Sequence, residues 1–107
     1  MNSFALLADP VRRRILEILS DGEQSAGTIG EAVSAEFRIR QPAVSNQLRV
    51  LRDADVVQSR REGSYRLYSL APGGLEEVTA WVDRYSHLWP GRLDALETEL
   101  ARHERHR

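Results

Sequence analysis

The stretch from Ile39 to Val57 reads Ile-Arg-Gln-Pro-Ala-Val-Ser-Asn-Gln-Leu-Arg-Val-Leu-Arg-Asp-Ala-Asp-Val-Val, and it decides the fold. Val44, Leu48 and Leu51 are spaced i, i+4, i+7, so a helix would place them on one apolar face. The opposite face would carry polar and cationic side chains, which are Gln41, Ser45, Asn46, Arg49 and Arg52. Amides, hydroxyls and guanidinium groups hydrogen-bond to base edges, and Arg also contacts phosphates. The pattern therefore predicts a recognition helix for double-stranded DNA.

Another helix is expected near the N-terminus. Asp9-Pro10 is typical of a helix start, because Asp caps free amides and Pro fits the first helical position. Ser20-Asp21-Gly22 should end this helix, since Gly readily adopts the left-handed conformation. Its buried face is predicted to consist of Val11, Ile15, Ile18 and Leu19. The triplet Arg12, Arg13 and Arg14 is then expected outside, as a solvated face or, as the less favoured alternative, on phosphates.

The next helix should begin after Ser25, which can cap it, and end near Phe37. Its inward-facing residues are predicted to be Ile29, Ala32 and Val33. A short turn from Arg38 to Arg40 then leads into the recognition helix. Two helices joined by a brief turn, the second with a polar outer face, make a helix-turn-helix. In it, the residues predicted to contact bases are Gln41, Ser45, Asn46 and Arg49.

After Asp55 the hydrophobic period changes from helical to alternating. Residues 56–61 and 65–70 are predicted strands, and Glu62-Gly63-Ser64 is the turn between them. A hairpin appended to a helix-turn-helix is a wing, whose arginines can reach the DNA backbone or an adjacent minor groove. The predicted backbone contacts, in the wing and around the recognition helix, are Arg38, Arg40, Arg52, Arg60, Arg61, Ser64 and Arg66. A solvated strand edge is the alternative interpretation of the wing arginines.

Large apolar side chains dominate the C-terminal part of the chain. A helical period resumes at Leu75, is expected to break at Pro90-Gly91, and then continues to Leu100. A short helix from Phe4 to Leu7 would add its own apolar side. This much apolar surface on a small chain predicts a homodimer with the interface residues Phe4, Leu7, Trp81, Tyr85, Leu88, Trp89, Leu93, Leu96 and Leu100. A flap over the subunit's own core is the alternative.

The length of 107 residues suits a single domain, 1–107, with a core at 4–70 and a helical dimerisation region at 75–102. The predicted class is mainly α with a small β-hairpin, a dimeric winged helix-turn-helix. The net charge is only -1, but residues 36–66 hold seven arginines and four acidic residues. This basic segment coincides with the predicted recognition helix and wing, so it favours DNA as the partner. A module that binds an acidic protein is the alternative.

Several classes of function are disfavoured by what the sequence lacks. The absence of Cys excludes disulfides, thiolate metal sites and cysteine nucleophiles. No apolar run approaches the ~20 residues that span a bilayer, and no signal-peptide pattern is present, so a cytoplasmic location is expected. A phosphate-binding Gly loop and a Ser-His-Asp arrangement are also missing. Neither an enzyme nor a bound cofactor is therefore predicted.

Three segments resemble the ArsR/SmtB family of winged helix-turn-helix bacterial repressors. They are Ala-Asp-Pro-Val-Arg-Arg-Arg-Ile-Leu-Glu-Ile-Leu at 8–19, Gln-Pro-Ala-Val-Ser-Asn-Gln-Leu-Arg-Val-Leu-Arg-Asp-Ala at 41–54, and Arg-Arg-Glu-Gly-Ser-Tyr-Arg-Leu-Tyr-Ser-Leu at 60–70. The resemblance covers more than half of the chain, and the agreement of separate segments makes it specific. It implies a homodimeric repressor of its own or a neighbouring operon that binds a pseudo-palindromic operator.

Three positions depart from the family pattern. Arg40 stands where Ser usually caps the recognition helix, so the helix is expected to start at Gln41 or Pro42. Gln47 stands where His is common, and Asp55 replaces a Gly at the helix end. The fold should tolerate these changes, since Asp enters the left-handed region more easily than most residues. The departures leave the base preference open.

The resemblance also bears on metal sensing. Family members that sense soft metals use cysteines in the helix before the recognition helix, and this chain has none. A second family site uses carboxylates and histidines of the C-terminal helix, for which the candidates here are Asp83, His87, His103 and His106. Their spacing does not match that site, so no metal site is predicted, and the histidines are interpreted as solvated. The sequence is interpreted as a branch of the family without the usual metal ligands.

Overall fold

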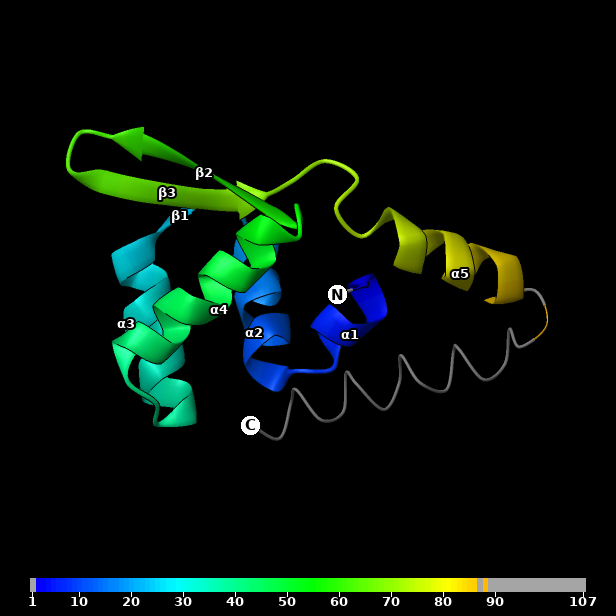
Figure 1. Cartoon of the computed structure of the whole chain (residues 1–107), viewed down its shortest axis with the longest axis horizontal. Coiled ribbons are helices and arrows are strands. Elements are labelled where there is room, and N and C mark those ends of the chain that lie inside the picture. The colour runs from blue at the N-terminus through cyan, green and yellow to red at the C-terminus, as the bar shows by residue number, and fades with distance from the viewer. Residues whose placement is uncertain (1, 87, 89–107) are drawn as a thin grey trace. The chain divides into compact units, whose positions relative to one another are not determined.

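The computed structural model describes residues 2–86 and residue 88 (Figure 1). Contacts divide the chain after Leu75 into two units, which are described separately. The first unit contains four helices and a small sheet, which are α1 (Ser3–Leu7), α2 (Pro10–Ser20), β1 (Gln24–Ser25), α3 (Ala26–Phe37), α4 (Gln41–Asp53), β2 (Val57–Glu62) and β3 (Tyr65–Leu70). This arrangement confirms the predicted class, mainly α with a β-hairpin that follows a helix-turn-helix.

Side chains at the predicted positions cap α2 and α3. The Asp9 carboxylate accepts hydrogen bonds from the backbone N–H groups of Val11 and Arg12, at 2.8 and 3.2 Å. Ser25 Oγ accepts from the N–H of Thr28 and so caps α3, as expected. By contrast, α4 begins at Gln41 without a side-chain cap, because Arg40 offers no acceptor. Its start therefore depends on Pro42 in the first turn and on packing.

The turn between α3 and α4 is held by its own backbone. Arg38 adopts the left-handed conformation, with φ of 55°, and ends α3. The N–H of Ile39 donates to the Ser34 carbonyl at 3.2 Å, and the Ser34 hydroxyl donates back to the Ile39 carbonyl. Asp55 is also left-handed, with φ of 60°, as expected for a residue in place of Gly.

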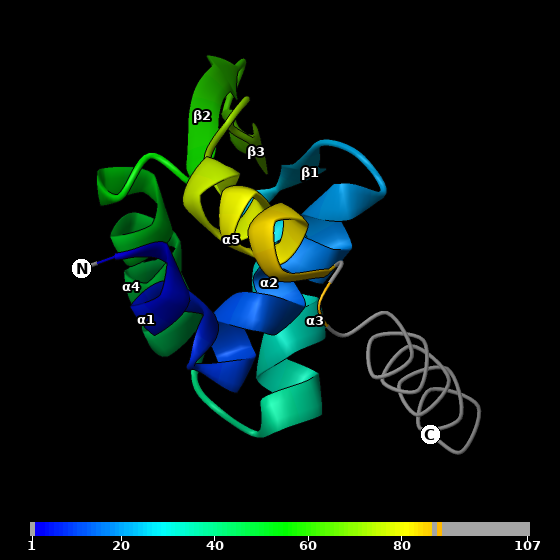
Figure 2. The ribbon, with the colours of Figure 1, turned by 90° about the vertical axis from the view of Figure 1, so that its right-hand side faces the viewer.

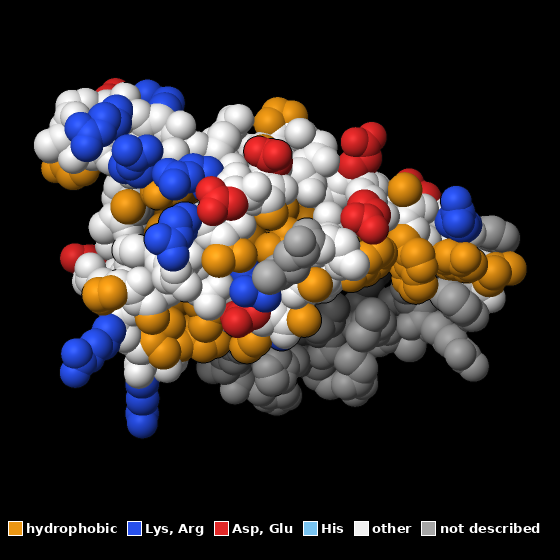
Figure 3. Space-filling view, viewed as in Figure 1, with side chains coloured by type: hydrophobic (Ala, Val, Ile, Leu, Met, Phe, Trp, Pro, Cys, Tyr) orange, Lys and Arg blue, Asp and Glu red, His pale blue; other side chains and the backbone are white. Residues whose placement is uncertain are grey.

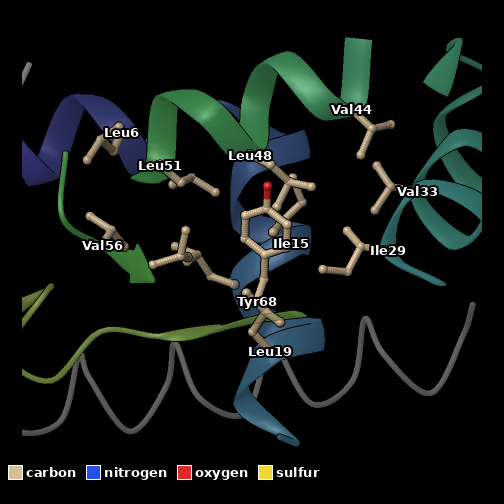
Figure 4. Packing of buried hydrophobic residues seen from close by; sticks show 12 residues of the cluster. Leu6, Ile15, Leu19, Ile29, Val33, Val44, Leu48, Leu51, Val56 and Tyr68 are labelled. Atoms are coloured by element: carbon tan, nitrogen blue, oxygen red, sulfur yellow. The ribbon is translucent and has the colours of Figure 1, made fainter. Parts of the chain in front are cut away.

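Apolar side chains from α1 to α4 and the hairpin meet in one core (Figure 4). Tyr68 enters it from β3, between side chains of α2 and α4. The core confirms the predicted apolar face of α4, and its buried members are Leu6, Ile15, Leu16, Leu19, Ile29, Val33, Val44, Leu48, Leu51, Val56, Val57 and Tyr68.

Three expectations about the helix faces were wrong or incomplete. Ala32 is exposed, because the buried face of α3 runs along Ile29 and Val33. On α2, Val11 and Ile18 are only half-buried, whereas Leu16 is buried. The buried face of α2 is thus rotated about its axis relative to the prediction.

The sheet contains one strand that the sequence did not reveal (Figure 2). Its order is β1-β3-β2, and all pairs are antiparallel. The two-residue β1 pairs with β3 through Gln24 and Tyr68, and it is too short to leave a period in the sequence. β2 and β3 form the predicted wing, in which Arg61 lies opposite Arg66. Gly63, with φ of 63°, allows the tight turn at the tip.

The second unit begins with α5 (Glu76–Ser86), where the helical period was expected to resume. Trp81 and Tyr85 pack on each other along it, with ring centroids 5.1 Å apart. Within residues 2–86 and 88, no helix is sufficiently long and apolar to cross a membrane. The predictions for His87, Trp89, Pro90-Gly91, Leu93, Leu96, Leu100, His103 and His106 lie outside the described residues.

Candidate nucleic-acid interface

The four residues predicted to contact bases come together on the outer face of α4. Gln41, Ser45, Asn46 and Arg49 are all exposed, and with Pro42 they line one open hollow on the surface. The helical period explains this for Ser45, Asn46 and Arg49, which point away from the face of the buried Val44, Leu48 and Leu51. Gln41 is exposed at the first position of the helix. Amide, hydroxyl and guanidinium groups are thus presented together by one helix, and these groups form hydrogen bonds with base edges.

Two of these side chains are already in contact. Arg49 Nη2 donates a hydrogen bond to Asn46 Oδ1, one helical turn away. The Asn46 amide nitrogen then keeps its donors, and the remaining guanidinium N–H groups of the exposed Arg49 stay available. The contact restricts both side chains to the outer face, so less side-chain entropy remains to be lost on binding a base pair.

Further arginines lie in the turn before α4, in its last turn and on the wing. Arg38 and Arg40 are exposed in the turn before α4, and Arg52 is half-buried in its last turn. Figure 3 shows arginine side chains over the hairpin and at the end of the unit where α3 turns into α4. In the part of the chain that the structure describes, Arg38, Arg40 and Arg61 form no hydrogen bond or ion pair with a side chain. They present uncompensated positive charge to the solvent.

The wing arginines are not equivalent. Arg60 donates to both carboxylate oxygens of Glu23, at 2.9 and 2.7 Å, and to Glu62 at 3.2 Å. The hydrogen bond from Arg60 lowers the pKa of Glu23, and the same bond raises the pKa of Arg60. Arg66 donates to the Ser59 hydroxyl at 3.2 Å. The predicted wing contacts thus differ in their surroundings. Arg61 and Ser64 are exposed near the tip of the hairpin, whereas Arg60 is bound to two carboxylates.

Sequence reasoning missed Glu23, because it lies 37 residues before Arg60 in the chain. β1 begins at the next residue and pairs with β3, and this pairing brings Glu23 to the wing. A short polar strand carries no hydrophobic period, so no sequence signal pointed to this pair.

Arg12 does not lie on the outside of α2 as expected. Its side chain is only 13% exposed, and its guanidinium group faces α1 and α4. Its exposed neighbour Arg13 donates to the Leu7 carbonyl at 2.6 Å. Arg14 pairs with Glu36 of α3 and with Glu17. The prediction of a uniformly solvated triplet was therefore wrong for Arg12.

The predicted interface residues that the structure describes all retain exposed surface. Phe4 is 40% exposed, Trp81 46% and Leu88 57%, whereas Leu7 and Tyr85 are half-buried.

Within residues 2–86 and 88, no three His, Cys, Asp or Glu side chains are grouped so that they could hold a metal ion.

Comparisons with known proteins agree with this geometry. A family model described as a helix-turn-helix domain matches residues 7–60, which include α2, α3, α4 and most of β2. The transcriptional repressor SdpR of Bacillus subtilis is 36% identical over 81 residues, which cover 76% of this chain and 86% of SdpR.

Two solved structures extend the similarity to the three-dimensional fold. The crystal structure of a possible transcriptional regulator for arsenical resistance has a TM-score of 0.66 and 33% identity, over 92% of this chain and 96% of that one. The solution structure of the homodimeric winged helix-turn-helix DNA-binding domain of Mb0332 from Mycobacterium bovis, a possible ArsR-family regulator, has a TM-score of 0.59 and 26% identity. It covers 79% of this chain and 77% of that one. On these grounds, the chain belongs to the ArsR family of winged helix-turn-helix transcriptional regulators.

Proposed function

We propose that this protein is a homodimeric transcriptional repressor that binds a pseudo-palindromic operator in double-stranded DNA, in the cytoplasm. The observation that carries the proposal is the outer face of α4, where Gln41, Ser45, Asn46 and Arg49 are exposed together beside unpaired arginines. The name of SdpR as a repressor and the homodimeric state of the Mb0332 domain support it. The proposed activity is binding, with no catalytic step.

In this proposal α4 lies in the major groove, where each base pair shows a distinct pattern of donors and acceptors. Arg49 suits guanine, because its guanidinium group can donate to O6 and N7 together. Asn46 and Gln41 suit adenine, and Ser45 can bond to either kind of base. Arg38, Arg40, Arg52 and the wing residues would hold phosphates on both sides of the groove.

A dimer is needed because one α4 contacts only a few base pairs. Two-fold symmetry places the second α4 on a second half-site, about one helical turn (~34 Å) or a multiple of it away. The proposed subunit contacts are apolar residues of α1 and of the C-terminal region, among them Phe4, Trp81 and Leu88, which are exposed in the single chain. The proposed target is the promoter of its own operon or of a neighbouring one.

The test is selection of bound duplexes from a random pool with the full chain, followed by titration of the selected duplex and a random duplex. Enrichment of an inverted repeat is expected. Arg49→Ala should then cost about 1–3 kcal/mol on the selected duplex and relax specificity at one position of each half-site. Arg61→Ala should weaken both duplexes alike and reduce the salt dependence. If no sequence is enriched, or if Arg49→Ala binds the selected duplex as tightly as wild type, the proposal fails.

A further inference from the structure

The guanidinium group of Arg12 connects three parts of the first unit. Nε donates to the Leu6 carbonyl at 2.9 Å and Nη2 to the Ala5 carbonyl at 3.2 Å, both on α1. Nη1 donates to Oε1 of Gln47 on α4 at 3.1 Å. The Asp9 carboxylate lies 4.0 Å from Nη1. One side chain thus binds α1 and the proposed recognition helix at the same time.

Burial strengthens the hydrogen bonds of Arg12. The Arg12 side chain is 13% exposed, so water competes for its donors far less than at a surface arginine. A fork of fixed donors is needed to reach acceptors on both helices, and Lys would supply only a single ammonium group. Arg12 is also unlike a phosphate-binding arginine. Its side chain is largely buried from solvent, and each of its three donor nitrogens already has an acceptor within the protein.

Gln47 lies at a sensitive place on α4. It is half-buried, and it follows Ser45 and Asn46, two of the proposed base contacts. Its bond with Arg12 is a directed side-chain hydrogen bond that joins α4 to α2. Apolar contacts, such as those of Leu48 and Leu51, also restrain α4, and the hydrogen bond adds a restraint that depends on the orientation of Gln47.

We propose that Arg12 is a positioning residue for operator binding: through Gln47 it fixes the rotation of α4 relative to α1. Arg12 itself does not touch DNA. α1 carries the exposed Phe4 of the proposed subunit interface, so a change in the packing of α1 reaches Ser45 and Asn46 through this bond. The inference rests on the proposed function for its consequence at DNA, and on the contacts above for the coupling itself.

The first test is a double-mutant cycle on the selected duplex. Gln47→Met removes the acceptor but keeps the length of the side chain, and it should weaken binding about fivefold, the worth of one directed hydrogen bond. Arg12→Met should have a similar effect without changing the slope of affinity against salt. The double variant should bind no worse than the weaker single variant. Arg13→Met removes the neighbouring exposed arginine and its bond to the Leu7 carbonyl on α1, but it leaves the Arg12–Gln47 bond to α4 intact, and it should change affinity less than about twofold.

Two results would overturn the inference. Independent, multiplied losses in the double variant would mean that Gln47 contacts DNA by itself. A slope reduced by about 0.9 in Arg12→Met would mean that Arg12 holds a phosphate. Arg12→Lys is the control for a folding defect in Arg12→Met, because it keeps the positive charge. It should lose affinity to a similar extent, because a single ammonium group cannot reach the acceptors on both helices.

A second test uses the free protein and needs no operator. Phe4→Ala should shift the backbone amide resonances of Ser45 and Asn46 in the wild-type background. In the Gln47→Met background the same substitution should leave them in place. Equal shifts in both backgrounds would refute the coupling. If the selection enriches no duplex, the proposed function fails, and this measurement still decides whether Arg12 links α1 to α4.

Discussion

Replacing Glu23 with Gln is expected to release a wing arginine for DNA. Arg60 is held by two short bonds to Glu23, and these bonds are charge-assisted, so a neutral amide would hold it less strongly. The pair is also solvent-exposed, at 56% for Arg60 and 33% for Glu23, so a phosphate can reach the guanidinium group. In the wild type, Glu23 therefore competes with DNA for Arg60.

The size of the effect follows from counterion release. One added phosphate contact steepens the slope of log affinity against log salt by about 0.9. From about 200 down to about 50 mM salt, a fourfold change, one contact therefore adds about 3.5-fold in affinity. Glu23→Gln should gain this increment on a random duplex and on a selected duplex alike, because phosphates carry no sequence information.

Fluorescence anisotropy of a labelled random duplex across salt concentrations measures both quantities. Glu17→Gln is the matched control: it removes the same charge from an acid that pairs with Arg14 on α2. It should change the slope far less, because Arg14 is not a proposed DNA contact and keeps its bond to Glu36 at 2.8 Å, whereas Arg60 would keep only its longer bond to Glu62 at 3.2 Å. If Glu23→Gln and Glu17→Gln change the slope equally, the competition between Glu23 and phosphate does not exist.

The remaining predictions concern stability, measured by urea unfolding. Leu51→Ala should cost about 2–5 kcal/mol, because Leu51 is 0% exposed, and a loss below about 1 kcal/mol would contradict its place in the core. Asp9→Ala should cost about 0.5–2 kcal/mol through loss of the α2 cap, and Asp9→Asn should keep most of it. Gly74→Ala should cost about 1–3 kcal/mol, since its Cβ would lie 2.9 Å from the Val56 backbone, whereas Gly27→Ala in α3, whose Cβ would meet only Ser25 Oγ at 3.9 Å, should not destabilise the fold. Because the pKa of Glu23 is below its ordinary 4.5, its ion pair stabilises the fold above about pH 4.5, and wild type should lose more stability than Glu23→Gln as the pH falls below that value.

The sequence contained most of the information for the fold because local signals agreed with one another. Asp9-Pro10 and Ser25 mark helix starts that the structure confirms, and the spacing of Val44, Leu48 and Leu51 predicts the buried face of α4 correctly. The alternating pattern from residue 56 onward predicts β2 and β3 to within one residue at each end. A cap, a turn residue and a hydrophobic period are each local properties of the sequence. Here each was sufficient to locate a helix start, a turn or the buried face of an element.

Pairings between distant parts of the chain were not accessible in the same way. β1 and the contact between Glu23 and Arg60 depend on where the loop after α2 meets the sheet, and no local pattern encodes that position. Seven arginines between residues 36 and 66 look alike in composition. The structure separates them by their partners: Arg61 has an exposed guanidinium group, whereas Arg60 is held by carboxylates.

Arg12 differs from these cases, because a local signal for it existed. It precedes Ile15, Leu16 and Leu19 by three, four and seven residues, so it lies on the face of α2 that these residues bury. The prediction placed Ile15 and Leu19 on that face correctly, but it added Val11 and Ile18, omitted Leu16 and left Arg12 outside. A charged residue in the register of a buried face must find acceptors, because an unpaired buried charge is too costly to keep. Such a position therefore predicts a contact with other elements from the hydrophobic period by itself, and in this chain the contact leads to Gln47 on the proposed recognition helix.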